Sequence, residues 1–269
     1  MGGFKDKVVF ITGASSGIGA GLAKEFADRG ASLVLTARRA DRLQSLSEEL
    51  KAGGGKALAV ACDVTKDGDQ EAAVEAALAE FGRIDVAVAN AGFGVGGTVD
   101  SLGLEDFRRQ FETNVYGVLR TFYATIEQLK KNRGTLVLMG SVSGHLSGPT
   151  TGPYAMSKYA VRAFAEALHG ELEPSGVRTV LISPGFVESE IRKVDRKGKV
   201  HPDAKDAAPP WLVMSTKKAA RQMVDGIEAG NRELVITAHG KLAVFLNNHF
   251  RPLISLAMRK SYKGRKKGR

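Results

Sequence analysis

The stretch Lys7-Val-Val-Phe-Ile-Thr-Gly-Ala-Ser-Ser-Gly-Ile-Gly19 decides the fold of this chain. Its first five residues form a short apolar, β-branched run, which is typical of a buried parallel strand. A helical pattern continues from Gly17 to Arg29 and stops at Gly30. A flexible loop is the alternative for the glycines, but here they join two strongly patterned elements. Strand, glycine loop and helix in this order predict a site for a pyrophosphate, which would meet backbone N–H groups and the helix dipole.

Alternation of strand and helix patterns continues along the chain and predicts one doubly wound α/β domain of the Rossmann type, with a seven-stranded parallel sheet. The domain is expected to span residues 1–239, followed by an apolar helical and basic extension over 240–269. The predicted strands lie near 7–12, 31–36, 57–61, 84–89, 134–140, 177–183 and 233–237. The predicted helices lie near 17–29, 40–52, 68–81, 104–131, 154–173 and 216–229.

Tyr154 and Lys158 stand four residues apart, so a helix would place both side chains on one face. A free tyrosine holds its proton until about pH 10, and a nearby ammonium favours the phenolate and lowers that pKa. This pair therefore suits proton exchange with a carbonyl or alcohol oxygen. Ser141 lies thirteen residues before the tyrosine, and Asn114 lies further upstream. Taken alone, the pair is more typical of a solvated helix surface.

Taken together, these segments resemble the short-chain dehydrogenase/reductase family over residues 7–236. Thr12 to Gly19 is similar to the family's cofactor loop, and Pro184-Gly185 to the turn beside its nicotinamide. Asn90-Ala91-Gly92 is similar to the segment after its fourth strand, although Ala89 stands where a second asparagine is usual. The resemblance implies a catalytic tetrad of Asn114, Ser141, Tyr154 and Lys158. It also implies that Asn114 lies in a locally distorted helix and binds a water that relays protons to the lysine.

The end of the second predicted strand indicates which cofactor binds. Ala37 stands where an acid would meet the ribose hydroxyls of NAD, and Arg38 follows at once, so NADP(H) is predicted. The alternative is that Arg38 and Arg39 are charged loop residues exposed to solvent, without a role in cofactor binding. Asp63 resembles the family residue that binds adenine, and a turn or N-cap role is also open to it. The predicted cofactor-binding residues are Gly13, Ser15, Ser16, Gly17, Ile18, Gly19, Arg38, Arg39, Asp63, Val64, Asn90, Ala91, Gly92, Tyr154, Lys158, Pro184, Gly185, Val187 and Ser189, with no metal ligand.

The predicted function is an NADP(H)-dependent oxidoreductase that interconverts a ketone or aldehyde and an alcohol. Residues 186–215 contain no confident strand or long helix and are read as a substrate lid. An apolar substrate is expected (a lipid, acyl, steroid or retinoid-like carbonyl), in a pocket that Phe93, His145, Leu146 and Trp211 could line. The alternative is a regulatory or scaffold protein that binds NADP without catalysis.

Charge is concentrated at the C-terminal end. The net charge is +10, and residues 240–269 carry nine Lys and Arg with no acid, so the preceding body is near neutral. This distribution argues against specific nucleic-acid binding. Two short apolar segments, 241–246 and 252–258, precede most of these cations. They either cover the fold or a dimer contact, or form a peripheral anchor on an anionic membrane surface.

Cysteine usage and the remaining family features suggest where the protein acts. Cys62 is the single cysteine, so no intramolecular disulfide can form, and no secretory signal precedes the first strand. A cytoplasmic location, with peripheral membrane contact as an option, is therefore expected. The resemblance implies a homodimer or homotetramer that packs through the helices predicted at 104–131 and 154–173. A monomer at micromolar concentration in light scattering would contradict this.

Overall fold

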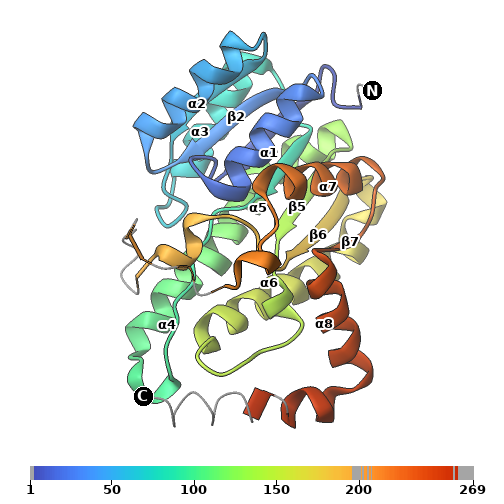
Figure 1. Ribbon diagram of the computed structural model, residues 1–269. Helices are drawn as coiled ribbons and strands as arrows, with labels where there is room; N and C mark the ends of the chain where they lie inside the picture. The colour runs from blue at the N-terminus through green and yellow to red at the C-terminus, as the bar shows by residue number, and fades with distance from the viewer. Residues whose placement is uncertain are drawn as a thin grey trace.

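In a computed structural model, which describes residues 3–195, 201, 203–204, 206, 208–256 and 258–259, all seven strands lie in one parallel sheet. The strand order is β3-β2-β1-β4-β5-β6-β7 (Figure 1). The strands are β1 (Val8–Thr12), β2 (Ser32–Ala37), β3 (Lys56–Ala61), β4 (Val86–Ala89), β5 (Thr135–Met139), β6 (Arg178–Pro184) and β7 (Glu233–Ile236). The seven-stranded parallel sheet predicted from the sequence is confirmed.

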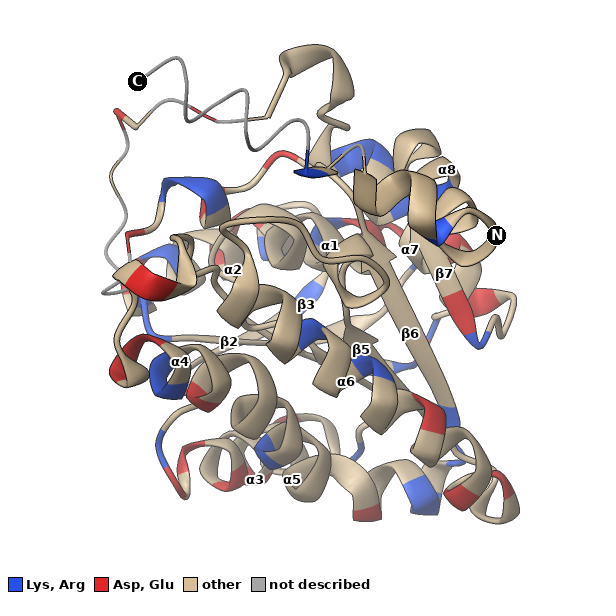
Figure 2. Ribbon diagram, turned by 90° about the horizontal axis from the view of Figure 1, so that it is seen from below, with Lys and Arg blue, Asp and Glu red and all other residues tan. Residues whose placement is uncertain are grey.

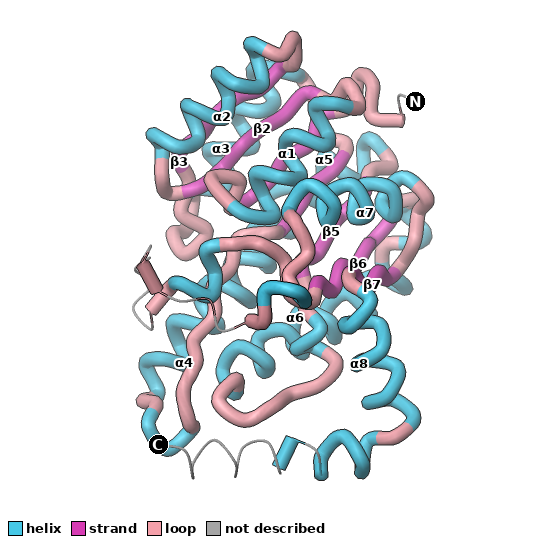
Figure 3. Tube along the Cα trace, in the orientation of Figure 1, coloured by secondary structure: helices cyan, strands magenta, loops and turns pink. Residues whose placement is uncertain are grey.

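Helices cover both faces of the sheet (Figures 1 and 3). On one face α1 (Gly17–Asp28), α2 (Ala40–Ala52) and α7 (Thr216–Glu228) share a core with Val9 and Ile11 of β1. On the other face α3 (Asp69–Phe81), α5 (Gly117–Asn132) and α6 (Gly152–Glu171) share a core with Val8 and Phe10. Successive β1 side chains enter opposite cores because side chains alternate along a strand. The continuous apolar run read in the sequence therefore reflects a strand buried on both faces.

The order of strands reverses between β1 and β4. Ile11 of β1 lies opposite Leu35 of β2 on one side and Val88 of β4 on the other. The crossover from β3 back to β4 leaves a crevice at the carboxyl ends of the central strands, where ligands bind in open α/β sheets. The glycine loop, which follows β1, lies at this point.

One predicted helix is interrupted. The range 104–131 contains α4 (Leu104–Phe111), a π-helical turn (Glu112–Tyr116) and then α5. A π turn holds one residue more than an α turn, so the helical faces before and after it are out of register. The single continuous helix expected here is wrong in that respect. The distorted turn contains Asn114, as the family resemblance implied.

The segment after β6 crosses the open end of the sheet. It contains the short helical turns η5 (Glu190–Lys193) and η6 (Pro210–Leu212), and Val187 pairs with Met214 in an isolated bridge. Residues 196–200, 202, 205 and 207 of the predicted lid lie outside the described residues. The described parts agree with the prediction that this range holds no long helix.

The chain beyond β7 forms α8 (Ala238–His249), followed by helical residues at 251–256. Asn247 Nδ2 donates to the His145 carbonyl oxygen at 2.9 Å, which ties α8 to the loop after β5. Several large apolar side chains remain exposed here: Leu242, Phe245, Phe250, Leu253 and Leu256. Most of the basic end, from residue 260 on, lies outside the described residues.

None of the helices in the described part of the chain is long and apolar enough to cross a membrane.

Candidate active site

A cavity of about 760 Å³ opens at the carboxyl ends of the strands. Every residue predicted to bind cofactor lines it, from Gly13 in the glycine loop to Ser189 after β6. Ser141, Tyr154 and Lys158 line it too, so the predicted catalytic and cofactor residues face one space. Asn114 is fully buried and lies outside the lining set.

The glycine loop is shaped for close backbone approach. Gly13 has a φ of +67°, and a Cβ added to it would lie 2.9 Å from the Cα of Ala91. Any side chain at this position would therefore be strained and would collide with backbone. At the start of α1, Ser16 makes no side-chain cap, so the first N–H groups of the helix have no side-chain acceptor from it. The free backbone N–H groups at the start of α1 can bind the phosphates of a dinucleotide, and the glycines leave room for those phosphates to approach the backbone.

Asn90 fixes the opposite wall of this loop. Its Nδ2 donates to the Thr12 carbonyl oxygen at 2.8 Å. The Thr12 hydroxyl oxygen accepts from the backbone N–H groups of Asn90 at 3.0 Å and Ala91 at 3.1 Å. These bonds connect the end of β1 to the end of β4 across the switch point of the sheet. The segment after β4 is thereby held where the glycine loop needs it.

The predicted catalytic side chains Ser141, Tyr154 and Lys158 lie just after β5 and on α6. Ser141 follows β5 and caps the turn Val142–Gly144, where its Oγ accepts from the Ser143 N–H at 3.1 Å. Tyr154 and Lys158 lie one turn apart on α6, as their spacing predicts, with the Lys158 Nζ 5.9 Å from the tyrosine ring centre. The Lys158 Nζ donates to the Met139 carbonyl oxygen at 2.7 Å. β5 is buried along its whole length, and Lys158 lies on the buried face of α6.

The pKa of Tyr154 departs from the expected direction. Burial raises it above its ordinary value, while a hydrogen bond with Ser141 and the charge of Arg192 oppose this rise. Lys158, which was expected to lower this pKa, is not among the groups that oppose the rise. The Lys158 side chain is only 4% exposed, and burial lowers its own pKa to about 8. The Lys158 ammonium therefore loses its proton at a lower pH than a free lysine does.

Asn114 holds the loop after β4 against α6. Its Oδ1 accepts from the Phe93 N–H at 3.1 Å, and its Nδ2 donates to the Phe93 carbonyl oxygen at 3.0 Å. The same Nδ2 donates to the Ser157 hydroxyl at 3.1 Å, on the active-site helix. Asn114 therefore joins the loop after β4 to α6 between Tyr154 and Lys158. The π-helical turn is what directs its amide toward both.

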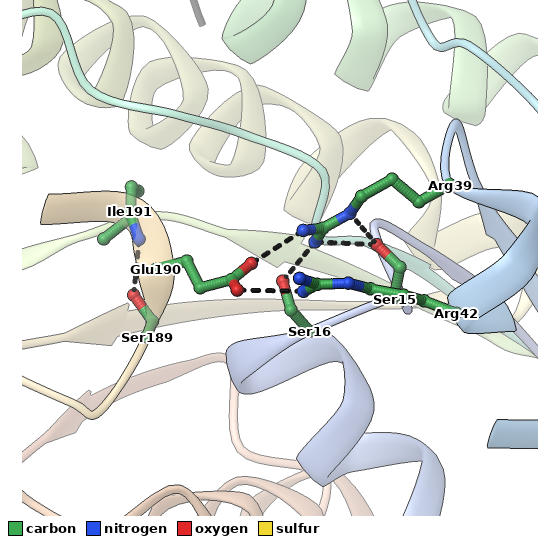
Figure 4. A network of polar contacts seen from close by, with 7 residues as sticks. All are labelled: Ser15, Ser16, Arg39, Arg42, Ser189, Glu190 and Ile191. Carbon is green, nitrogen blue, oxygen red and sulfur yellow. Dashed lines mark hydrogen bonds and ion pairs between the residues drawn. The ribbon is translucent and has the colours of Figure 1, made fainter. Parts of the chain in front are cut away.

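Arg39 lines the cavity beside the end of β2, and Figure 4 shows its polar contacts. Its Nη2 donates to the hydroxyls of Ser15 and Ser16 at 3.0 and 2.7 Å. Its Nη1 pairs with Glu190 at 2.8 Å, and Arg42 binds the other oxygen of this carboxylate at the same distance. The neighbouring Arg38 is exposed at the rim and has no ion-pair partner among the described residues. A cluster of cations thus marks the end of the cavity next to β2.

Comparison with known proteins agrees with this geometry. The family model described as short chain dehydrogenase matches residues 7–199. The chain belongs to the short-chain dehydrogenase family. Its relatives include an uncharacterized oxidoreductase of Staphylococcus saprophyticus, 38% identical over 194 residues, which covers 71% of this chain and 78% of that protein. An Arabidopsis thaliana protein named 11-beta-hydroxysteroid dehydrogenase 1A is 36% identical over 233 residues, 82% of this chain and 65% of that protein.

Solved structures in the same family carry two kinds of nucleotide. A short-chain dehydrogenase/reductase from Burkholderia phymatum in complex with NAD has a TM-score of 0.83 at 26% identity, covering 94% of this chain and 96% of that one. An alcohol dehydrogenase from Thermococcus sibiricus complexed with 5-hydroxy-NADP has a TM-score of 0.74 at 29% identity, covering 86% and 96%. The chain is therefore an oxidoreductase of a family whose members bind nicotinamide dinucleotides.

The predicted substrate wall needs correction within this family fold. Phe93 lines the cavity, whereas His145, Leu146 and Trp211 do not. His145 is buried, with its Nε2 3.0 Å from the Ser183 hydroxyl, and burial lowers its pKa. Trp211 is 82% exposed on η6. Asp63, whose role was left open, accepts from the Thr65 N–H at 3.0 Å and also lines the cavity.

Sequence reasoning missed several residues at the site. Charged side chains of α4 line the cavity, and acidic and basic residues lie side by side on that helix (Figure 2): Glu105, Arg108 and Arg109. Gln110 is fully buried and its Oε1 accepts from the Val95 N–H at 2.6 Å, which supports the loop that carries Phe93. Glu190 reaches Arg39 across 151 positions of sequence. No local pattern marks such a contact, since only the fold brings the two segments together.

Proposed function

We propose that this protein is an NADP(H)-dependent oxidoreductase that interconverts a ketone or aldehyde and an alcohol. The observation that supports this best is that Tyr154, Ser141 and Lys158 share one cavity with the glycine loop at the switch point of the sheet. Ligands of open α/β sheets bind at this point. A cluster of proton-exchanging groups beside a dinucleotide cradle is what reduction of a carbonyl requires.

The chemistry divides between cofactor and chain. When bound, the nicotinamide supplies or accepts the hydride. Negative charge grows on the substrate oxygen during reduction, so donors must already point at it. Ser141 would hold and polarise that oxygen, and Tyr154 would donate its proton to it. Lys158, four residues after Tyr154, would hold the nicotinamide ribose. Once its ammonium no longer donates to the Met139 carbonyl oxygen, it would also favour the ionised form of Tyr154.

Asn114 would act in this mechanism through position. It is bonded to Phe93 and Ser157, so it keeps the loop after β4 against α6. A water bound near this junction would pass protons toward Lys158, as the family resemblance implies. Residues Gly13, Ser15, Ile18, Asn90 and Gly185 would bind or border the cofactor because they line the cavity around it.

Direct assay tests the proposal. Purified protein with NADPH and a panel of ketones and aldehydes should consume the reduced nicotinamide, followed by its absorbance. The panel should include apolar carbonyls of medium size, since Phe93, Val187, Ile191 and Val194 line the cavity. Absence of turnover above that of a Tyr154→Phe variant on every substrate would defeat the enzymatic proposal.

A cofactor-binding scaffold without catalysis is the alternative function. It would have no use for a lysine buried at 4% exposure, whose charge is costly enough that burial lowers its pKa to about 8. A scaffold would be more stable with an apolar residue there. The buried lysine therefore favours an enzyme.

Cofactor preference is expected to depend on Arg38. NADPH should bind more tightly than NADH, because Ala37 supplies no carboxylate to repel a 2′-phosphate and Arg38 at the rim can bind it. Arg38→Ala should weaken NADPH binding by about 1–3 kcal/mol, the usual range for hydrogen bonds to charged groups, and leave NADH binding unchanged. Arg221→Ala, an exposed arginine of α7, is the matched control. Equal affinities of the unmodified protein for both cofactors, measured by titration calorimetry, would contradict this.

We also propose that the chain forms a homodimer or homotetramer through α5 and α6. Tyr123 of α5 is 68% exposed, and Met156 and Tyr159 of α6 are exposed as well. Exposed aromatic and methionine side chains are enriched at interfaces. Burial of this face would support the back of the active-site helix.

The chain end provides a surface that fits an anionic membrane, which we propose the protein meets peripherally from the cytoplasm. The exposed apolar side chains of α8 and the turns after it precede seven Lys and Arg in residues 259–269. Full-length protein should sediment with anionic liposomes at low salt. Leu242→Asp with Leu253→Asp should reduce this binding severalfold, whereas Leu104→Asp, an exposed leucine of α4, should not. Sedimentation that ignores the first pair of substitutions would contradict the proposal.

A further inference from the structure

The carboxylate of Glu190 sits between two arginines that belong to the cofactor end of the cavity. Its Oε2 lies 2.8 Å from the Arg39 Nη1, and its Oε1 lies 2.8 Å from the Arg42 Nη1 (Figure 4). These ion pairs lower the pKa of Glu190 to about 2, so it is ionised at any working pH. The glutamate comes from η5, after β6, while both arginines follow β2. The lid and the cofactor end of the cleft are therefore joined by charge.

This carboxylate occupies a place built for an anion. Arg39, which binds it, is also held by the hydroxyls of Ser15 and Ser16 in the glycine loop. Arg42 lies in the first turn of α2, a helix of 13 residues whose N-terminus has no side-chain cap. The positive end of that helix adds to the field of the arginines. Asp41 of the same turn is exposed and forms no ion pair among the described residues, so Glu190 alone pairs with this cluster. One carboxylate cannot neutralise Arg38, Arg39 and Arg42 together, and the cluster keeps capacity for a more strongly charged group.

We propose that Glu190 competes with the cofactor's 2′-phosphate for Arg39 and Arg42. When the phosphate displaces the Glu190 carboxylate, η5 is released from the cofactor end of the cavity. This inference rests on the proposed use of NADP(H). A phosphate monoester carries close to two negative charges and three acceptor oxygens, against one charge and two oxygens for the carboxylate. It would take over the guanidinium donors of Arg39 and Arg42 as Glu190 moves to solvent.

The displaced segment reaches the reacting end of the cavity. Two positions after Glu190, Arg192 binds Asp206 through both Nε and Nη2 at 2.6 Å, and its Nη1 donates to the Val187 carbonyl oxygen at 3.0 Å. The charge of Arg192 also acts on Tyr154. Movement of Glu190 would thus shift Arg192 on the same turn and change its electrostatic effect on Tyr154. Cofactors without the 2′-phosphate would leave this contact closed.

The competing interpretation is that Glu190 stays in place and accepts hydrogen bonds from ribose hydroxyls, as an acid does in an NAD site. Both oxygens of Glu190 are already engaged by guanidinium groups, however, and the acid position after β2 holds Ala37. The two interpretations predict opposite effects of removing the carboxylate charge, so one substitution separates them.

Titration calorimetry with adenosine 2′,5′-bisphosphate and 5′-AMP tests the proposal on the full chain. Glu190→Gln should bind the bisphosphate about three- to tenfold more tightly than the unmodified protein, the size expected from two partly exposed ion pairs. Its affinity for 5′-AMP should stay within about twofold. Glu188→Gln is the matched control, because Glu188 accepts from the Thr216 N–H and forms no ion pair with an arginine of the described residues. Unchanged or weaker bisphosphate binding by Glu190→Gln would overturn the proposal, as would a loss of 5′-AMP binding.

Hydrogen exchange gives a second reading of the same event. The bisphosphate should raise amide exchange over 189–194 in the unmodified protein, 5′-AMP should not, and Glu190→Gln should exchange faster there without ligand. Protection of this segment by the bisphosphate would overturn the proposal. Equal affinities of the unmodified protein for the two nucleotides would instead defeat the NADP(H) preference. In that case the competitor role stands if Glu190→Gln still gains affinity for the bisphosphate alone, and falls if it does not.

Discussion

Replacing Tyr154 with phenylalanine is expected to lower kcat for carbonyl reduction by about 10²- to 10⁴-fold, the range for loss of a general acid. The ring would remain in α6, and the Ser141 Oγ would still accept from the Ser143 N–H, so the fold should persist. Cofactor affinity should change little, because the hydroxyl acts on the substrate oxygen. Steady-state rates, with calorimetric cofactor affinity alongside, provide the measurement.

The reverse reaction gives an independent check on Tyr154. The phenolate is the base for alcohol oxidation, so kcat for oxidation should rise with pH through the tyrosine pKa. Burial raises that pKa in the structure, so the rise should lie at alkaline pH. In Tyr154→Phe this rise should disappear. Rates near those of the unmodified enzyme would mean that the proton comes from another group.

Replacing Lys158 with methionine should abolish most activity and at the same time stabilise the fold. Burial lowers the pKa of Lys158 from 10.5 to about 8, so holding its charge at neutral pH costs on the order of 3 kcal/mol. The ammonium also loses its 2.7 Å hydrogen bond to the Met139 carbonyl oxygen, which offsets about 1.5 kcal/mol of this gain, the lower end of the range for hydrogen bonds to charged groups. A net gain of about 1.5 kcal/mol in the free energy of unfolding is therefore expected at pH 7. Turnover should fall because the ammonium that supports Tyr154 and the cofactor is gone.

The pH dependence of stability identifies the source of this gain. Between about pH 8 and 10.5 the unfolded chain binds more protons at Lys158 than the folded chain does, so the free energy of unfolding rises with pH there. The methionine variant lacks this rise, and its advantage should shrink as pH approaches 10.5. Lys130→Met, at an exposed lysine of α5, is the control and should change stability by less than about 0.5 kcal/mol. Denaturant unfolding at pH 7 and pH 10 measures both, and equal stability of Lys158→Met and the unmodified protein at pH 7 would contradict the argument.

The fold could be predicted from the sequence because each strand and most helices have a recognisable local sequence pattern. Buried parallel strands such as β1 and β5 read as unbroken apolar runs, and glycines mark the turn after β1. The interruption at 112–116 could not be located in this way. Glu112 to Tyr116 is compatible with an ordinary α-helix on its pattern, and the π turn is favoured only once Asn114 is bonded to Phe93 and Ser157.

The parts of the site that consist of motif residues could be predicted from the sequence. The ion pairs between segments distant in the sequence could not. Tyr154 and Lys158 lie one turn apart because helical spacing requires it. The raised tyrosine pKa and the bond from Lys158 to Met139 depend on burial and on a strand that sequence spacing does not place. Glu190 pairs with Arg39 for the same reason, since η5 and the end of β2 become neighbours only through the order of strands in the sheet.

The position of Trp211 gives the protein an internal optical probe. It is the single tryptophan of the sequence, and it lies 82% exposed on η6 in the segment that crosses the open end of the sheet. All indole emission of the protein therefore comes from this one turn. Its wavelength reports how far water surrounds residues 210–212. Any change in the surroundings of this turn when a ligand is added can thus be followed in real time without attaching a label.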